Sequence, residues 1–186
     1  MKFKSPYIVF SAPSGGGKTT IVKMLKQKYP QTVISVSATT RAKRPGEVDG
    51  SDYFFLTREE FERKIKEGKF LEYEQVHGNY YGTLKEVVDQ HVRNNKVVLF
   101  DIDVNGALSV KRHYPQAILI FIKPPSEAVL VERLKKRHTE SEESIKKRLQ
   151  RLPYEYEQAK KFDYIIINDD LQQTLKKVEA CILQED

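Results

Sequence analysis

Residues 11–20 combine the chemical groups that a phosphate-binding loop needs. After Ser11 the run contains, in order, Ala12, Pro13, Ser14, Gly15, Gly16, Gly17, Lys18, Thr19 and Thr20. Consecutive glycines let the backbone turn so that several N–H groups converge on one point, and a helix beginning there directs its positive dipole end at the same point. The Lys18 ammonium can contact terminal phosphates, and the Thr19 hydroxyl can ligate magnesium. The run therefore predicts a site for a phosphate chain and its metal ion.

The same run matches the P-loop pattern G-x-x-x-x-G-K-[ST], except that Ala12 stands where the first glycine belongs. Alanine adds only a methyl group, but it requires an ordinary φ at that position. Glycine-rich turns also occur in many unrelated folds, so the flanking elements decide between the two interpretations. An apolar run at residues 7–10 predicts a strand before the loop, and apolar residues recur at helical spacing from Ile21 onward. This strand, loop and helix order favours a phosphate site.

A further candidate for the metal site follows the apolar run at residues 97–100. Asp101 ends that run, and Asp103 lies two residues further on, so an extended backbone would direct both carboxylates to one side. P-loop enzymes use an acid in this position to anchor magnesium, often through water, beside the threonine of the loop. Acids at strand ends are otherwise commonly only solvated. We therefore assign Thr19 and Asp101 to magnesium.

Residues 38–52 lack apolar periodicity and are rich in Thr, Arg, Lys, Pro and Gly. Arg41 and Arg44 lie three residues apart in this segment, and two such guanidinium groups can clamp a second phosphate. Taken alone, the segment is typical of a solvated basic loop. The hydroxyl groups of Tyr53 and Tyr81 could contact the same phosphate, which favours a functional interpretation.

Composition argues against several other classes of protein. The chain has 186 residues, of which 39% are hydrophobic, enough for one core with insertions. It contains no run of about 18 apolar residues, and its N-terminus lacks the long apolar segment of a secretory leader. We therefore expect a single domain in the cytoplasm with no membrane contact.

The net charge of +6 is spread over predicted helices in which lysines mix with glutamates. Such mixing is typical of a solvated face, so we expect no nucleic-acid surface, and small polyanionic ligands would account for the basic excess. The four histidines are scattered without Cys or carboxylates at metal-ligand spacing, which argues against zinc. The single cysteine, Cys181, is expected on the buried side of the terminal helix.

The pattern of apolar runs predicts an α/β fold, a doubly wound parallel sheet of about five strands. Strands are expected at residues 7–10, 33–37, 97–101, 117–122 and 164–167, the last three buried on both faces. Helices are expected at 21–29, 84–92, 105–112, 127–136 and 144–160, the last kinked at Pro153. Further extended runs, at 53–56 and 70–76, flank a helix that Thr57 and Glu60 cap, and residues 78–83 are a turn cluster.

Considered together, these separated motifs resemble the guanylate kinases, P-loop nucleoside monophosphate kinases that transfer the terminal phosphate of ATP to GMP. The resemblance covers residues 7–170 and rests on segments in the family's order, at 11–20, 37–50, 78–83, 101–103, 133–148 and 167–170. It implies synthesis of ADP and GDP in purine nucleotide metabolism, with Mg²⁺ accompanying ATP, no organic prosthetic group, and dGMP as a further candidate acceptor. A monomer is expected.

The resemblance also implies roles for individual residues. The GMP phosphate is assigned to Arg41, Arg44, Tyr53 and Tyr81, with Glu47 orienting the arginines, and the guanine to Ser37, Glu72 and Thr83, with Asp101 and Asp103 also in the GMP site. ATP is assigned to residues 12–20 with Asn168 near the adenine, and phosphoryl transfer to Lys18, Arg41, Arg133, Arg137 and Arg148. The implied layout is one domain with a core at 1–36 and 84–186, an inserted α+β GMP-binding subdomain at 37–83, and a short lid at 137–144.

Two other functions compete with this one. The chain could be a P-loop kinase of a different small phosphorylated acceptor, although Glu72 with Ser37 argues for a guanine. It could also be a non-catalytic interaction module, because guanylate kinase-like domains serve as parts of scaffold proteins. Such modules typically lose residues of the ATP site, whereas this chain retains Lys18, Thr19 and Asp101.

Overall fold

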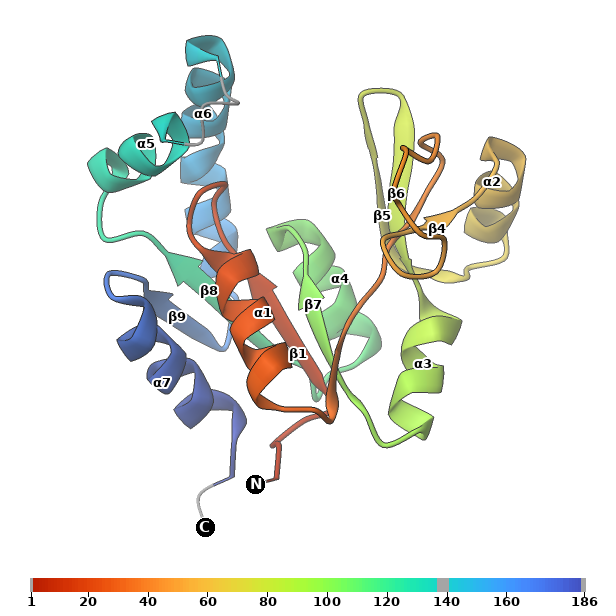
Figure 1. Cartoon of the computed structure of the whole chain (residues 1–186), viewed down its shortest axis with the longest axis horizontal. Coiled ribbons are helices and arrows are strands. Elements are labelled where there is room, and N and C mark those ends of the chain that lie inside the picture. The colour runs from red at the N-terminus through yellow and green to blue at the C-terminus, as the bar shows by residue number, and fades with distance from the viewer. Residues whose placement is uncertain (1, 137–140, 185–186) are drawn as a thin grey trace.

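The computed structural model describes residues 2–136 and 141–184 and arranges them around a five-stranded sheet (Figure 1). Neighbouring strands of this sheet all pair in parallel. In order across the sheet they are β2 (Thr32–Ile34), β7 (Val97–Asp101), β1 (Tyr7–Ser11), β8 (Ile118–Lys123) and β9 (Tyr164–Ile167). The apolar runs of the sequence form the three central strands, β7, β1 and β8, because only apolar side chains can be buried on both faces of a sheet. The predicted parallel sheet is confirmed.

Helices cover both faces of this sheet, as the doubly wound prediction requires. α1 (Lys18–Lys28) and α7 (Leu171–Ile182) pack on one face. α3 (Lys85–Arg93), α4 (Val104–His113) and α6 (Glu142–Ala159) pack on the other, and α5 (Glu127–Lys135) packs with α6 in a smaller cluster. Pro153, at which the sequence predicts a kink, lies inside α6. These crossovers bring the loop after β1 and the end of β7 to the same edge of the sheet.

The prediction of full burial is wrong for β9. The strand has its predicted bounds, but Tyr164, Ile165 and Ile167 are 39%, 49% and 52% exposed. β9 ends the sheet, so it has a partner strand, β8, on one side, and its Ile166 packs beneath α7. An apolar run is compatible with a central or an edge strand, and the order of strands decides between them.

A second sheet is formed by residues between β2 and α3. Its strands are, in order, β4 (Phe54–Phe55), β3 (Ala38–Thr39), β6 (Asn79–Leu84) and β5 (Phe70–Val76). α2 (Arg58–Lys66) begins at the capping box that was predicted for Thr57 and Glu60. It packs on this sheet through the buried Phe61, whose ring stacks on the ring of Phe70. Figure 1 shows this sheet and α2 standing apart from α5 and the upper part of α6, on the other side of the loop that follows β1.

Two predictions for this region are wrong. Residues 78–83, predicted as a turn cluster, mostly form β6, and the turn itself lies at His77 and Gly78, whose φ angles are positive. The strand predicted for residues 33–37 ends at Ile34, and part of the predicted loop, Ala38–Thr39, forms β3. β6 pairs with its neighbour β5 in a hairpin and also with β3, which is distant in sequence, and no local pattern reveals the pairing of β3 with β6.

Three smaller observations complete the fold. Cys181 is half-buried on α7 and packs against the core beneath that helix. Among the helices of residues 2–136 and 141–184, none has the length and apolar character needed to cross a membrane. The same residues include no group of three or more His, Cys, Asp or Glu side chains that could hold a metal ion.

Candidate active site

The glycine loop between β1 and α1 forms a cradle at the carboxyl edge of the sheet. Gly15 and Gly17 have φ angles of +90° and +93°, which residues with a side chain rarely adopt. Ala12 has no such φ, which explains why alanine can occupy the first position of the pattern. Together with Asp101, Asp103 and Glu155, the loop lines a cavity of about 310 Å³. We call this the loop cavity.

Asp101, at the end of β7, contacts the first two side chains of α1. Its Oδ1 lies 2.6 Å from Nζ of Lys18, and its Oδ2 accepts a 2.7 Å hydrogen bond from Oγ1 of Thr19. Lys18 Nζ also donates to the carbonyl oxygen of Ile102 at 2.9 Å. Hydroxyl and carboxylate oxygens are the donors that Mg²⁺ prefers, and this ion usually takes its remaining ligands from phosphates and water. The Thr19 and Asp101 pair therefore fits a nucleotide-bound magnesium ion.

Asn168, directly after β9, holds the glycine loop in place. Its buried side chain donates from Nδ2 to the carbonyl oxygen of Gly16 at 2.9 Å, and its Oδ1 accepts from Thr174 Oγ1 at 3.1 Å. A β-carbon at Gly17 would lie 2.2 Å from Asn168 Nδ2, so a side chain at Gly17 is excluded by space as well as by φ. Arg133 of α5 donates to the carbonyl oxygen of Asn168 at 3.0 Å. Both polar ends of the Asn168 amide are thus engaged by the protein.

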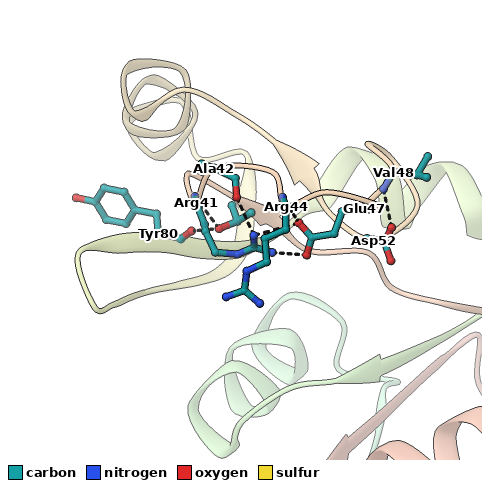
Figure 2. Close-up of polar contacts among 8 residues, drawn as sticks. Arg41, Ala42, Arg44, Glu47, Val48, Asp52 and Tyr80 are labelled. Carbon is teal, nitrogen blue, oxygen red and sulfur yellow. Dashed lines mark hydrogen bonds and ion pairs between the residues drawn. The ribbon is translucent and has the colours of Figure 1, made fainter.

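The basic loop after β3 is organised by one carboxylate (Figure 2). Arg41 donates to both oxygens of Glu47, at 2.7 and 3.0 Å, and the backbone N–H of Arg44 donates to Glu47 at 2.7 Å. These hydrogen bonds lower the pKa of Glu47 below its usual value, and the carboxylate raises the pKa of Arg41. The Arg41 guanidinium also lies over the ring of Tyr53, at 5.2 Å. Glu47 therefore fixes the Arg41 guanidinium and the Arg44 backbone relative to each other.

Glu72 lies on β5, where that strand faces the core sheet. Its Oε1 accepts a 2.6 Å hydrogen bond from the buried Thr83 hydroxyl on β6. Burial, together with the neighbouring Asp103 and Glu74 carboxylates, raises the pKa of Glu72 to about 7 against the lowering effect of the Thr83 hydrogen bond. Glu72 lines a cavity of about 340 Å³, which we call the acceptor cavity. Its other lining residues are Lys18, Ser37, Tyr53, Glu74, Val76, Tyr81, Gly82, Asp101, Ile102 and Asp103.

The loop cavity and the acceptor cavity meet, because Lys18, Asp101 and Asp103 line both. Asp103 is fixed at this junction by two hydrogen bonds. Its Oδ1 caps α4 by accepting from the Gly106 N–H at 2.8 Å, and its Oδ2 accepts from Arg151 of α6 at 2.9 Å. The two cavities thus adjoin at one lysine and two carboxylates.

Comparison with known proteins agrees with this arrangement. The family model described as guanylate kinase matches residues 4–185. The chain belongs to the guanylate kinase family. It is 44% identical to a guanylate kinase of Thermotoga maritima over 98% of this chain and 88% of that one, and 48% identical to a guanylate kinase of Chlorobaculum tepidum over 95% and 91%. The crystal structure of guanylate kinase from Anaplasma phagocytophilum superposes with a TM-score of 0.70 at 32% identity, covering 94% of this chain and 82% of that one. The chain is thus an enzyme of the kinase class with a P-loop kinase fold.

Not all residues that the guanylate kinase resemblance singled out gather at the two cavities. Arg148 of α6 reaches the loop and contacts the Ser14 hydroxyl, whereas Arg133 lies on the far side of the loop, beside Asn168. Arg137 and residues 137–140 of the predicted lid lie outside the described residues, and residues 142–144 belong to the first turn of α6. Arg44 lies in the basic loop, where its backbone N–H donates to the Glu47 carboxylate.

Sequence reasoning missed two residues of α6. Arg151 bridges Asp103 and Glu155, with an N–O distance of 3.6 Å to the latter, and Glu155 lines the loop cavity. Burial raises the pKa of Glu155. A signal was present, because positions three and seven residues after Arg148 lie on the same face of a helix. That helical face contacts the loop through Arg148, so Arg151 and Glu155 had to be directed at the site as well.

Proposed function

We propose that this chain transfers the γ-phosphoryl group of ATP to GMP, giving ADP and GDP. The observation that carries the proposal is the junction of the loop cavity with the acceptor cavity at Lys18, Asp101 and Asp103. A kinase that moves a phosphoryl group directly between two nucleotides needs two adjoining sites that share the groups neutralising the transferred charge. Membership of the guanylate kinase family supports ATP and GMP as the two substrates.

On the donor side, the backbone N–H groups of residues 12–20 bind the ATP phosphates, and the Lys18 ammonium follows the migrating phosphoryl group. Thr19 and Asp101 would hold Mg²⁺, which when bound neutralises charge on the β- and γ-phosphates. Lys18 Nζ already lies at the entrance to the acceptor cavity, since it lines both cavities. Asn168 acts on the donor side by holding Gly16.

On the acceptor side, Arg41 and Arg44 bind the GMP phosphate together with the hydroxyl groups of Tyr53 and Tyr81. The Glu47 carboxylate keeps Arg41 oriented, so little side-chain freedom is lost on binding. The guanine is read by Glu72, Ser37 and Thr83, with Asp103 beside them. Guanine presents two donors on one edge, N1–H and the 2-amino group, and an ionised carboxylate presents two acceptors in a matching plane. Adenine has an acceptor at N1 and would leave the carboxylate unpaired.

The reaction itself requires no nucleophilic side chain. A GMP phosphate oxygen attacks the γ-phosphorus, a P–O bond forms, and the bond to the β-phosphate oxygen breaks, leaving ADP. Arg133, Arg137 and Arg148 are assigned to neutralising charge on the transferred group, a role for which an arginine is worth about 10³ to 10⁵ in rate. Residues 37–83 act as a GMP-binding subdomain and residues 137–144 as a lid that excludes water. A monomeric state and a cytoplasmic location stay predictions.

A nucleoside monophosphate panel tests the proposal. A coupled assay measures the rate at which ADP forms from ATP. This rate should be high with GMP and lower by a factor of about 10⁴ or more with AMP, since a site built to hydrogen-bond one ligand rejects an analogue that lacks the bonding group. CMP and UMP serve as further controls. Comparable rates with AMP and GMP would contradict the base assignment, and no rate with any nucleotide would favour a non-catalytic module.

A further inference from the structure

Gly106, in the first turn of α4, lies where two of the site carboxylates meet. Its N–H donates to Asp103 Oδ1 at 2.8 Å. A β-carbon at Gly106 would lie 3.2 Å from that same oxygen and 3.3 Å from both Cγ and Oε2 of Glu72. These separations are shorter than ordinary van der Waals contact, so an added methyl group would displace Glu72, Asp103 or both. The absence of a side chain at Gly106 is what lets Glu72 approach α4.

The backbone of α4 gives no reason for a glycine here. Gly106 is not among the residues with positive φ, and it lies within a regular helix that Asp103 caps. Among residues other than proline, glycine is the poorest helix former, and alanine is the best. Compared with alanine, a glycine at this position therefore lowers the stability of the helix, and it relieves no backbone strain. What the glycine provides is space for the side chains of both Asp103 and Glu72.

Glu72 cannot avoid α4 by moving with its strand. Ser109, one turn after Gly106, donates from Oγ to the carbonyl oxygen of Leu71 at 2.6 Å, which holds β5 against the helix. On the other side, Thr83 holds Glu72 Oε1 at 2.6 Å. The Glu72 carboxylate is thus confined between a hydroxyl group and the bare backbone of α4.

We propose that Gly106 is a positioning residue that determines specificity for GMP. By lacking a side chain, it seats the Glu72 carboxylate against α4 beside Asp103, so that both carboxylates are available to the donor edge of the guanine. The inference rests on the proposed function, and it gives the first turn of α4 a part in positioning the side chains that read the base. Gly106 acts through Glu72 and Asp103 and does not itself bond the substrate.

The test adds one methyl group. Gly106→Ala should weaken GMP binding, measured by calorimetry, about tenfold, the factor that corresponds to weakening one charge-assisted hydrogen bond. Binding of ATP should change by less than twofold, and circular dichroism checks that the variant is folded. GMP binding and phosphorylation by the parent protein test the proposed function separately. If the parent phosphorylates GMP and Gly106→Ala binds GMP equally well, Gly106 has no positioning role.

Two further variants separate positioning from damage to the helix. Asn105→Ala changes the neighbouring exposed position of α4 and should leave GMP affinity within twofold; an equal loss in this variant would overturn the proposal. Glu72→Asp withdraws the carboxylate by one methylene and leaves room for the new methyl group. Adding Gly106→Ala to Glu72→Asp should therefore weaken GMP binding by less than twofold, even if Gly106→Ala alone fails to fold. A tenfold loss in that background as well would show that the methyl group does not act through the Glu72 side chain.

Discussion

At the scale of single residues, the candidate site pairs its cations with carboxylates of the chain. Lys18 lies against Asp101 and Arg41 against Glu47, and the four side chains are only 14% to 23% exposed. Such pairs hold a charge in a defined position at the cost of removing it partly from water. A phosphate that enters the site therefore meets oriented cations. Glu72 differs from these groups because its main partner, Thr83, is neutral, and burial keeps its pKa near 7.

Replacing Lys18 by methionine removes the charge that neutralises the transferred phosphoryl group while retaining helix propensity. We expect single-turnover formation of GDP to slow by about 10²-fold or more, the usual cost of losing one electrostatic contact to a transition state. Circular dichroism should show an unchanged fold. Lys23→Met, at an exposed position of the same helix, is the matched control and should react like the parent. Near-parent rates for Lys18→Met would contradict the P-loop assignment.

The titration of Glu72 predicts how GMP affinity depends on pH. Guanine binding needs the ionised carboxylate, so affinity should rise with pH up to about 7 and then level off, changing by up to about tenfold per pH unit below that value. Glu72→Gln should bind GMP weakly and retain only the titration of the GMP phosphate, whose pKa is about 6. Calorimetry between pH 5.5 and 8.5, at about half-unit steps, measures both profiles. If GMP affinity depends on pH in the same way in the parent and in Glu72→Gln, Glu72 does not contact the base.

The same titration affects stability with a defined sign. The folded protein keeps a proton on Glu72 up to a pKa of about 7, whereas the unfolded chain releases it near the ordinary value of 4.5. Between these values the folded state binds more protons, so this group lowers the free energy of unfolding as pH rises. Glu72→Gln should remove that slope, and urea titrations at several pH values would detect it. If the free energy of unfolding of Glu72→Gln depends on pH with the same slope as in the parent, other carboxyl groups cause that slope.

At the scale of elements, the site depends on where helices and strands end. The loop after β1 is held from β9 by Asn168, α4 is capped by Asp103, and α6 reaches both regions through Arg148 and Arg151. The contacts of Asn168, Arg148 and Arg151 each join segments far apart in sequence. The glycine loop is thus shaped by its own φ angles and by the elements that surround it.

Asn168→Ala tests the link between β9 and the glycine loop. It leaves the carbonyl oxygen of Gly16 and the hydroxyl of Thr174 without the amide, so we expect the free energy of unfolding to fall by about 1 to 3 kcal/mol. The KM for ATP should rise more than the KM for GMP, because the loop forms the donor site. Chemical denaturation and steady-state kinetics measure the two effects. Asp169→Ala, at the next and exposed position, is the control; equal effects in both variants would refute a specific role for Asn168.

At the scale of the whole molecule, the second sheet stands to one side of the core sheet, apart from α5 and the upper part of α6 (Figure 1). The loop cavity and the acceptor cavity adjoin at the carboxyl edge of the core sheet. The second sheet contacts the core mainly through β5 on α4 and through β6, which precedes α3. Phosphoryl transfer in P-loop kinases excludes water, and hinge closure around both substrates is one way to achieve this. We therefore expect residues 37–83 to move as a unit.

GMP together with an unreactive ATP analogue should lower the radius of gyration measured by small-angle scattering. GMP alone should produce part of the change, since it contacts both the second sheet and the core. Glu72→Ala, which is expected to weaken GMP binding, provides a control that should require more GMP for the same change. A radius that stays constant at saturation with both ligands would count against closure by a moving subdomain.

The sequence by itself determined the elements whose signals are local. The glycine loop, the apolar strand ending at Asp101, the Thr57 and Glu60 capping box and the basic loop around Arg41 all lie within short segments, because turn geometry, capping and burial on both faces impose residue types directly. Alternation of strands and helices then allowed the parallel sheet to be predicted. The motifs taken together also pointed to the family.

The tertiary structure decided what depends on partners distant in sequence. Residues of β6 have a turn-like composition, and the strand forms because β3 and β5 supply its hydrogen bonds. β9 is an exposed edge strand, and an apolar run does not reveal the order of strands in a sheet. The raised pKa of Glu72 arises from burial between β6 and α4, which lie far apart in the sequence from the residues that form the glycine loop. The contacts of Gly106 with Glu72 and Asp103 became recognisable only once α4 was seen against β5, since they leave no pattern along the chain.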